Sequence, residues 1–243
     1  MGRIFEKRKA RMFARWSKTS KAFTKLGKEL AIAVKMSGTD PASNPRLRMA
    51  MQTAKSLNMP KDRIQNAIER AASKDDADLA EITYEGYGPH GIAIFVECTS
   101  NNPTRTVANV RNYLTRNGGN LATDGALTFL FSRQGIFRIK SPTDIDPDDL
   151  QLELIDSGLE EMFETEDGDL LIYTSFEDFG TMQKALEDRH IEVVNAGLQR
   201  NPINTAELSP EHEKEVLKIV YLLEEDEDVQ HVYHNMLQSE DEE

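Results

Sequence analysis

The charge of this chain divides sharply near residue 74, and that division restricts how its two parts fold and what they bind. Residues 1–74 hold 18 Lys and Arg against 5 Asp and Glu, a net charge of +13. Residues 75–243 hold 11 against 37, a net charge of -26. Moderate salt screens patches that are more than about 10 Å apart. The whole-chain net charge of -13 therefore says little about the basic segment, which we consider on its own.

A cationic stripe follows the first helix that the sequence predicts. Apolar side chains, among them Trp16, Phe23 and Leu30, share the opposite face. Hydroxyl side chains at residues 17–20 could start a new helix and break the common phase, so one long helix and two shorter ones both remain open. The members of the stripe recur every three or four residues within an arc of roughly 140°: Arg3, Lys7, Arg11, Arg15, Lys18, Lys21, Lys25 and Lys28.

Two further helices have clear start signals. Asn44 and Pro45 are typical of an N-cap and a first helical position, and residues 58–60 open the next helix. Apolar residues keep helical spacing after both starts. We therefore expect residues 1–78 to form a basic, all-helical domain whose boundary is the polar run 73–78. Its further surface cations are Arg46, Arg48, Lys55, Lys61 and Arg63.

The stripe predicts binding to nucleic acid. Lys and Arg side chains that displace counterions from phosphates gain affinity with little dependence on base sequence. A face that serves only solubility usually mixes the two signs of charge, and this one contains almost no acid. The alternatives are a solvated face or contact with the acidic half of the same chain, and a membrane surface or an acidic protein as partner.

The acidic remainder predicts an α+β fold. Strands are expected at 92–97, 127–131, 135–139, 160–165, 170–174, 193–198 and 229–233, and helices at 104–116, 147–157, 176–189 and 211–224. Residues 135–200 thus follow the order strand, helix, strand, strand, helix, strand, which is that of a ferredoxin-like sandwich. We expect two such α+β domains, one inserted in the other: residues 79–132 plus 203–243, and residues 133–202.

This half offers little chemistry. The acidic runs at 144–149, 164–169 and 224–228 lack the ligand spacing of a calcium loop and are expected to be solvated surface. Gly86, Gly88 and Gly91 match G-x-G-x-x-G in the wrong context, and are expected to form turns. Cys98 is expected to be a core residue, and a single cysteine fits a reducing, cytoplasmic setting. No apolar run is long enough to span a bilayer. The sequence thus predicts no catalytic residue, metal, cofactor, small-molecule substrate or membrane partner.

Residues 84–131, YEGYGPHGIAIFVECTSNNPTRTVANVRNYLTRNGGNLATDGALTFLF, closely resemble the YebC/PmpR family, whose mitochondrial relatives include a translational activator of cytochrome oxidase. The resemblance extends to KAFTKLGKEL, to DPASNPRLRMAMQTAKSLNMPKDRIQNAIERA and to DVQHVYHNM, and so covers nearly the whole chain. GPHG stands where GPGG is usual, and MGRIFEKRKARMFARW replaces a GHSKW-type start. The resemblance implies a helical domain followed by two α+β domains, one inserted into the other.

The resemblance also implies a function. Family members are described as cytoplasmic DNA-binding transcriptional regulators, and others resemble ribosome-associated factors that relieve stalling, notably at proline stretches. The cations that carry over best are Lys25, Lys28, Arg46, Arg48 and Arg63. We expect a non-enzymatic regulator that binds nucleic acid through its basic domain, with promoter DNA as the target and ribosomal RNA as the alternative.

Overall fold

A computed structural model describes residues 2–73, 79–142, 145–165 and 167–237, with side chains from residue 20 onward in these ranges. The N-terminal part consists of three helices, α1 (Gly2–Ser37), α2 (Pro45–Ser56) and α3 (Lys61–Ala72). The prediction of an all-helical N-terminal part is confirmed. Helix α1 runs unbroken through residues 17–20, so the first cationic stretch is one helix. Leu30, Leu47, Ile64 and Ile68 form the centre of its apolar core.

Asn44 joins the end of α1 to the start of α2. Its side chain is buried, accepts a hydrogen bond from the amide of Leu47 and donates to the carbonyls of Ala33 and Gly38, at 3.0, 2.7 and 2.8 Å. Gly38 adopts a left-handed conformation, φ +84°, in the turn that follows α1. One amide side chain therefore fixes the angle at which the second helix leaves the first.

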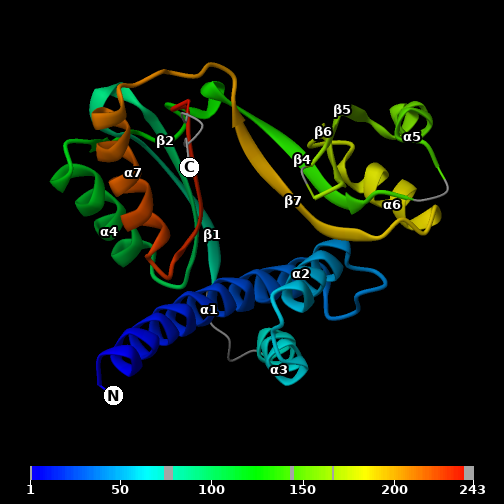
Figure 1. Cartoon of the computed structure of the whole chain (residues 1–243), viewed down its shortest axis with the longest axis horizontal. Coiled ribbons are helices and arrows are strands. Elements are labelled where there is room, and N and C mark those ends of the chain that lie inside the picture. The colour runs from blue at the N-terminus through cyan, green and yellow to red at the C-terminus, as the bar shows by residue number, and fades with distance from the viewer. Residues whose placement is uncertain (1, 74–78, 143–144, 166, 238–243) are drawn as a thin grey trace.

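The first sheet is antiparallel with strand order β3-β1-β2-β8. Its strands are β1 (Ala80–Tyr87), β2 (Ala93–Ser100), β3 (Asn120–Leu121) and β8 (Val229–His234). Helices α4 (Pro103–Arg116) and α7 (Pro210–Glu224) cover one face, as Figure 1 shows, where Ile94 and Val96 contact Val110 and Ile219. Strand β2 is buried on both sides because Phe95 packs on the other face.

Two expectations about this region are wrong. Residues 127–131 are predicted as a strand, but they form a single 3-10 turn, Thr128–Leu130, before β4 begins. The buried carboxylate of Glu85 accepts hydrogen bonds from the amides of Gly125 and Leu127 and from the Thr128 hydroxyl, and these bonds hold the segment as a loop. Gly86 lies within β1 instead of in a turn, where a Cβ atom would come within 2.8 Å of the Asn120 carbonyl oxygen.

The turn between β1 and β2 contains a residue in an uncommon conformation. His90, in the 3-10 turn Pro89–Gly91, has φ +60°. Glycine adopts this left-handed region at little cost, whereas histidine does so rarely. The ring of His90 stacks on His212 with centroids 3.6 Å apart, and its Nε2 atom lies 2.9 Å from the Glu215 carboxylate. These contacts compensate for the backbone conformation.

The second sheet lies wholly between β3 and α7 in the chain and has strand order β5-β6-β4-β7. This is the order of a ferredoxin-like sandwich, as the sequence predicts. Two helices cover one face, and their contact with the sheet is centred on Phe137 and Ile172. The elements are β4 (Phe131–Lys140), α5 (Pro147–Leu154), the 3-10 turn Ile155–Ser157, β5 (Leu159–Glu164), β6 (Asp169–Ser175), α6 (Phe179–Asp188) and β7 (Val193–Pro202).

The helical part contacts both sheet-containing parts, which lie on either side of a gap in Figure 1. Strands β4 and β7 pair along their full length and join the two sides. Arg200 of β7 fastens this pair to the first sheet, because its guanidinium lies 4.0 Å from the centre of the Phe95 ring and donates to Glu97 at 2.8 Å. Helix α2 contacts the second sheet-containing part, where Gln52 donates to the Val193 carbonyl of β7 and the Arg48 Nε atom lies 3.2 Å from the Glu187 carboxylate of α6.

The substitution Asn44→Ala should lower the free energy of unfolding by about 2 to 3 kcal/mol, because it removes an N-cap and leaves two carbonyls without their donor. Asn102 caps α4 in the same Asn-Pro context but is exposed, and its side chain accepts one hydrogen bond, from the Arg105 amide. Asn102→Ala should therefore cost only about 1 kcal/mol. Urea denaturation of both variants checks this, and equal losses of stability would contradict the role assigned to Asn44.

Candidate nucleic-acid interface

Three lysines of the predicted stripe contact the C-terminal end of α7. Lys21 reaches the carboxylate of Glu225, Lys25 donates to the Glu224 carbonyl at 2.8 Å, and Lys28 donates to the Glu227 carbonyl at 2.8 Å. The last carbonyls of a helix lack intrahelical donors and carry a partial negative charge, which cations stabilise. The three lysines are spaced i, i+4, i+7, so one face of α1 caps α7.

Asp228 is the centre of this contact. Its side chain, 6% exposed, accepts from Lys28 at 2.7 Å, from Arg105 at 2.7 Å and from the hydroxyl of Thr106 at 3.0 Å. Burial acts to raise the pKa of Asp228, but the hydrogen bonds from Lys28, Arg105 and Thr106 outweigh it and lower the pKa from 3.8 to about 2. Asp228 is therefore charged at neutral pH.

The expectation that the acidic runs are solvated is wrong for the 224–228 run, which forms this contact. It is also wrong for Asp169 in the 164–169 run. Asp169 is buried and accepts from Arg138 at 2.6 Å and from Lys140 at 2.8 Å. Those hydrogen bonds hold the pKa of Asp169 below its ordinary value. Part of the negative charge of the chain thus forms ion pairs with Lys and Arg side chains of the same chain.

Two more predicted cations also pair within the chain. Arg46 bridges Glu29 of α1 and Glu81 of β1. Burial acts to lower the pKa of Arg46, but the hydrogen bonds to Glu81 and Glu29 outweigh it and raise the pKa above its ordinary value. Arg48 pairs with Glu187 of α6. With the three lysines, five of the predicted cations occupy contacts within the chain, which agrees with the alternative of contact with the acidic half.

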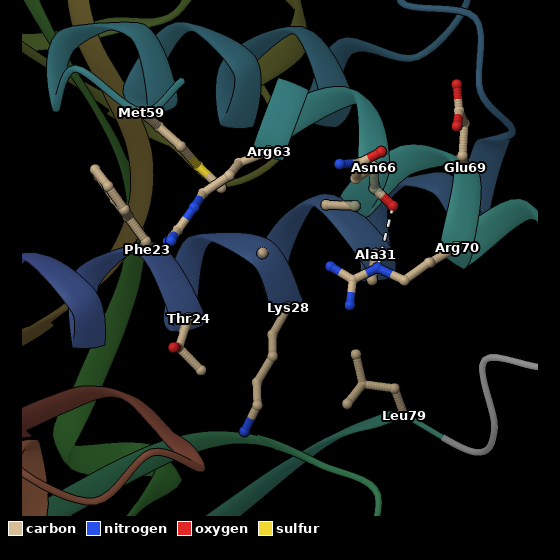
Figure 2. A pocket seen from close by; sticks show the side chains of 12 residues that line it. Phe23, Thr24, Lys28, Ala31, Met59, Arg63, Asn66, Glu69, Arg70 and Leu79 are labelled. Atoms are coloured by element: carbon tan, nitrogen blue, oxygen red, sulfur yellow. Dashed lines mark hydrogen bonds between the residues drawn. The ribbon is translucent and has the colours of Figure 1, made fainter. Parts of the chain in front are cut away.

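Arg63 lies in a different setting, at a cleft of about 730 Å³ between α1 and α3 (Figure 2). Its guanidinium lies 5.7 Å from the centre of the Phe23 ring. Arg70, two turns further along α3, lines the same cleft and donates to the Asn66 carbonyl at 3.2 Å. The sequence analysis did not identify Arg70 or Phe23 as site residues. The available signal was spacing, because Arg70 follows Arg63 by seven residues and so lies on the same face of α3, opposite Phe23 of α1.

The other predicted cations lie in the first half of α1. Arg3, Lys7, Arg11, Arg15 and Lys18 belong to the helix by their backbone, but their side chains lie outside the described residues. Residues 2–19 contain seven Lys and Arg and one acid, Glu6. The helix therefore carries its highest density of positive charge N-terminal to Lys21, beyond the three lysines that contact residues 224–228.

Other chemistry finds little support in the described residues. Burial raises the pKa of the Cys98 thiol to about 12, and nearby Asp226 and Asp228 act in the same direction, so Cys98 is a protonated core residue at neutral pH. Within the described ranges, no group of three or more His, Cys, Asp or Glu could hold a metal ion. Every helix of the described part is too short or too polar to cross a bilayer.

Comparison with known proteins agrees with this architecture. The model of the TACO1/YebC protein N-terminal domain matches residues 3–74, and the model of the TACO1/YebC second and third domain matches residues 79–236. The chain belongs to the TACO1/YebC family. The resemblance seen in the sequence is thereby confirmed.

Relatives of this TACO1/YebC chain match it from end to end. A protein of Parabacteroides distasonis is 50% identical over 243 residues, with 100% of both chains covered, and one of Cytophaga hutchinsonii is 51% identical over 99% of this chain and 100% of its own. Both are named probable transcriptional regulatory proteins. The crystal structure of a conserved hypothetical protein from Aquifex aeolicus superposes with a TM-score of 0.79 at 33% identity, covering 92% of this chain and 93% of that one.

The substitution Asp228→Asn should lower the free energy of unfolding by about 3 kcal/mol at pH 7, since it removes the charge that Lys28 and Arg105 share in a buried site. The folded-state pKa is depressed, so the contribution is present above pH about 4 and is lost as pH falls toward 2. Unfolding curves of both proteins between pH 2 and pH 8 measure it. The exposed Asp188→Asn is the control and should change little, and a difference that persists at pH 2 would contradict the account.

Proposed function

We propose that this chain is a non-enzymatic regulator of gene expression that acts in the cytoplasm and binds nucleic-acid phosphates through its helical N-terminal part. The names of its relatives support a regulatory role. One observation carries the proposal: docking on α7 occupies Lys21, Lys25 and Lys28, while the same unbroken helix continues for about five turns toward the N-terminus with seven cations and one acid.

The docking also gives the basic helix a fixed direction. Lys21 and Lys28 are tied to the body at two points on one helical face, so the first half of α1 projects from a defined base (Figure 1). A polyanion bound there would meet cations arranged along a rod. Backbone phosphates are regularly spaced charges and suit such a rod, with weak dependence on base sequence.

Further cations on the described helical surface support the same role. Lys35, Lys55, Lys61, Arg63 and Arg70 are exposed, and none of them forms an ion pair among the described residues. We propose three domains, residues 1–78, residues 79–132 plus 203–243, and residues 133–202, of which the first binds phosphates and the acidic two orient it.

DNA is the target that the relatives' names favour, and folded RNA is the alternative. One physical argument favours RNA. Shape and backbone charge are enough for RNA recognition, whereas phosphate contacts alone discriminate weakly between DNA sequences. Crosslinking in cells followed by sequencing separates them. Enrichment of promoter fragments supports the DNA version, and enrichment of ribosomal RNA supports a ribosome-associated translation factor.

The full chain with Lys7, Arg11, Arg15 and Lys18 changed to Gln should bind nucleic acid much more weakly. For duplex DNA, the log-log dependence of affinity on salt should flatten by about 0.9 for each phosphate that the variant no longer binds. Fluorescence anisotropy at several salt concentrations measures both quantities. The matched control changes Arg116, Lys184, Lys214 and Lys218 to Gln, which removes the same charge from the body. Equal binding by the two variants would reject the stripe as the contact surface.

A further inference from the structure

The described residues give no packing reason for Gly27. It lies in the interior of α1, where glycine is the least favourable residue apart from proline. A Cβ atom built at this position meets no heavy atom within 4 Å, so no close packing demands its absence. Glycine in a helix also serves where a ligand approaches the backbone closely. Gly27 lines the cleft between α1 and α3, where a ligand would meet the bare backbone of α1.

The cleft has the size and lining of a binding site. Its volume of about 730 Å³ lies within the range of small-molecule sites, roughly 300–1,000 Å³. Gly27, Ala31 and Ala67 line it with small side chains, which leave the helix surfaces bare. Phe23 lies at one end and Leu79 at the other in Figure 2.

Two arginines enter this space from α3. Figure 2 shows Arg63 pointing toward Phe23 and the Arg70 guanidinium beside Ala31, on opposite sides of the bare stretch of α1. Neither forms an ion pair among the described residues. Glu69, the carboxylate that lines the cleft, accepts from Gln65 at 2.8 Å and points away from both guanidinium groups in Figure 2. Among the described residues, the cleft therefore presents two positive charges that no lining carboxylate pairs with.

The spacing of the arginines indicates an extended ligand. Arg63 and Arg70 are seven residues apart, which corresponds to about 10 Å along a helix axis. One strand of a nucleic acid advances about 3.4 Å per nucleotide, so that distance spans about three steps. A short stretch of backbone can therefore place one phosphate on each guanidinium group.

We propose that the cleft between α1 and α3 binds a stretch of nucleic-acid backbone, with phosphates on Arg63 and Arg70 and the chain of the ligand passing over Gly27. This inference rests on the proposed function for the nature of the polymer. It adds a site that is separate from the stripe on the first half of α1. Lys28, whose ammonium group is held by Asp228, forms the rim of the cleft on the side of the first sheet.

The test fills the cleft without changing its charge. Gly27→Leu places a side chain over the bare stretch of α1, and because leucine favours helix, the variant should fold at least as well. Gly180, on α6, likewise has nothing within 4 Å of a built Cβ atom, so Gly180→Leu is the matched control. Binding of the full-length proteins to a structured RNA, a single-stranded DNA and a duplex DNA is measured by anisotropy. We expect at least a tenfold decrease in affinity for Gly27→Leu and none for Gly180→Leu.

A second pair of variants tests the charges. Arg63→Gln with Arg70→Gln should weaken binding more than tenfold and flatten its salt dependence by about one to two units, as expected for two phosphate contacts. Arg111→Gln with Arg116→Gln removes the same charge from α4 and should leave both quantities close to those of the unchanged protein.

The outcomes separate the two proposals. If the unchanged protein binds none of the three nucleic acids, the proposed function itself fails. If the unchanged protein binds, and both Gly27→Leu and the Arg63/Arg70 variant bind as tightly as it does, the proposed function stands and the cleft is rejected as a binding site. Binding of AMP that Gly27→Leu abolishes, with polymer binding unchanged, would also overturn the inference, since the cleft would then hold a free nucleotide.

Discussion

The contact between one face of α1 and the end of α7 determines how the charge of this protein is used. Three lysine ammonium groups meet backbone carbonyls and carboxylates at residues 224–228, and Asp228 gathers Lys28 and Arg105 in a nearly buried site. Exposed ion pairs contribute little to stability. The contact between α1 and the end of α7 differs, because it combines the burial of Asp228, several hydrogen bonds and the negative end of a helix. It fastens the helical part to the first sheet, while Arg48 fastens it to the second.

A consequence is that α1 has two roles along its length. Lys21, Lys25 and Lys28 contact a segment of the same chain, residues 224–228, whose clustered carboxylates resemble a short polyanion. The first half of the helix carries the same type of side chain at the same spacing. The charge division of the sequence thus serves assembly of the fold in one half of α1, and we propose that it serves ligand binding in the other.

The sequence predicts the elements of this fold better than their contacts. Helical spacing and the Asn44-Pro45 start are local signals, and the second sheet follows from the order of its strands. The strand expected at 127–131 fails because Glu85, some forty residues earlier, binds that segment as a loop. The partners of Lys21 and Lys28 lie about 200 residues away in the chain, and no local pattern identifies them. Gly27 is a local signal for the cleft, visible as a glycine within a helical pattern, but its meaning depends on α3 packing opposite.

The division of α1 into a docked half and a ligand-binding half can be measured directly by the reactivity of its lysines toward an acylating reagent, read by mass spectrometry with and without nucleic acid. We predict that Lys21, Lys25 and Lys28 react slowly in the free protein, and that the rates of Lys21 and Lys25, which lie outside the cleft, do not change on binding. Lys7 and Lys18 should react quickly and become protected, while Lys184 and Lys214 stay reactive throughout. Fast reaction of Lys21, Lys25 and Lys28 in the free protein, with protection only when nucleic acid is bound, would contradict the account.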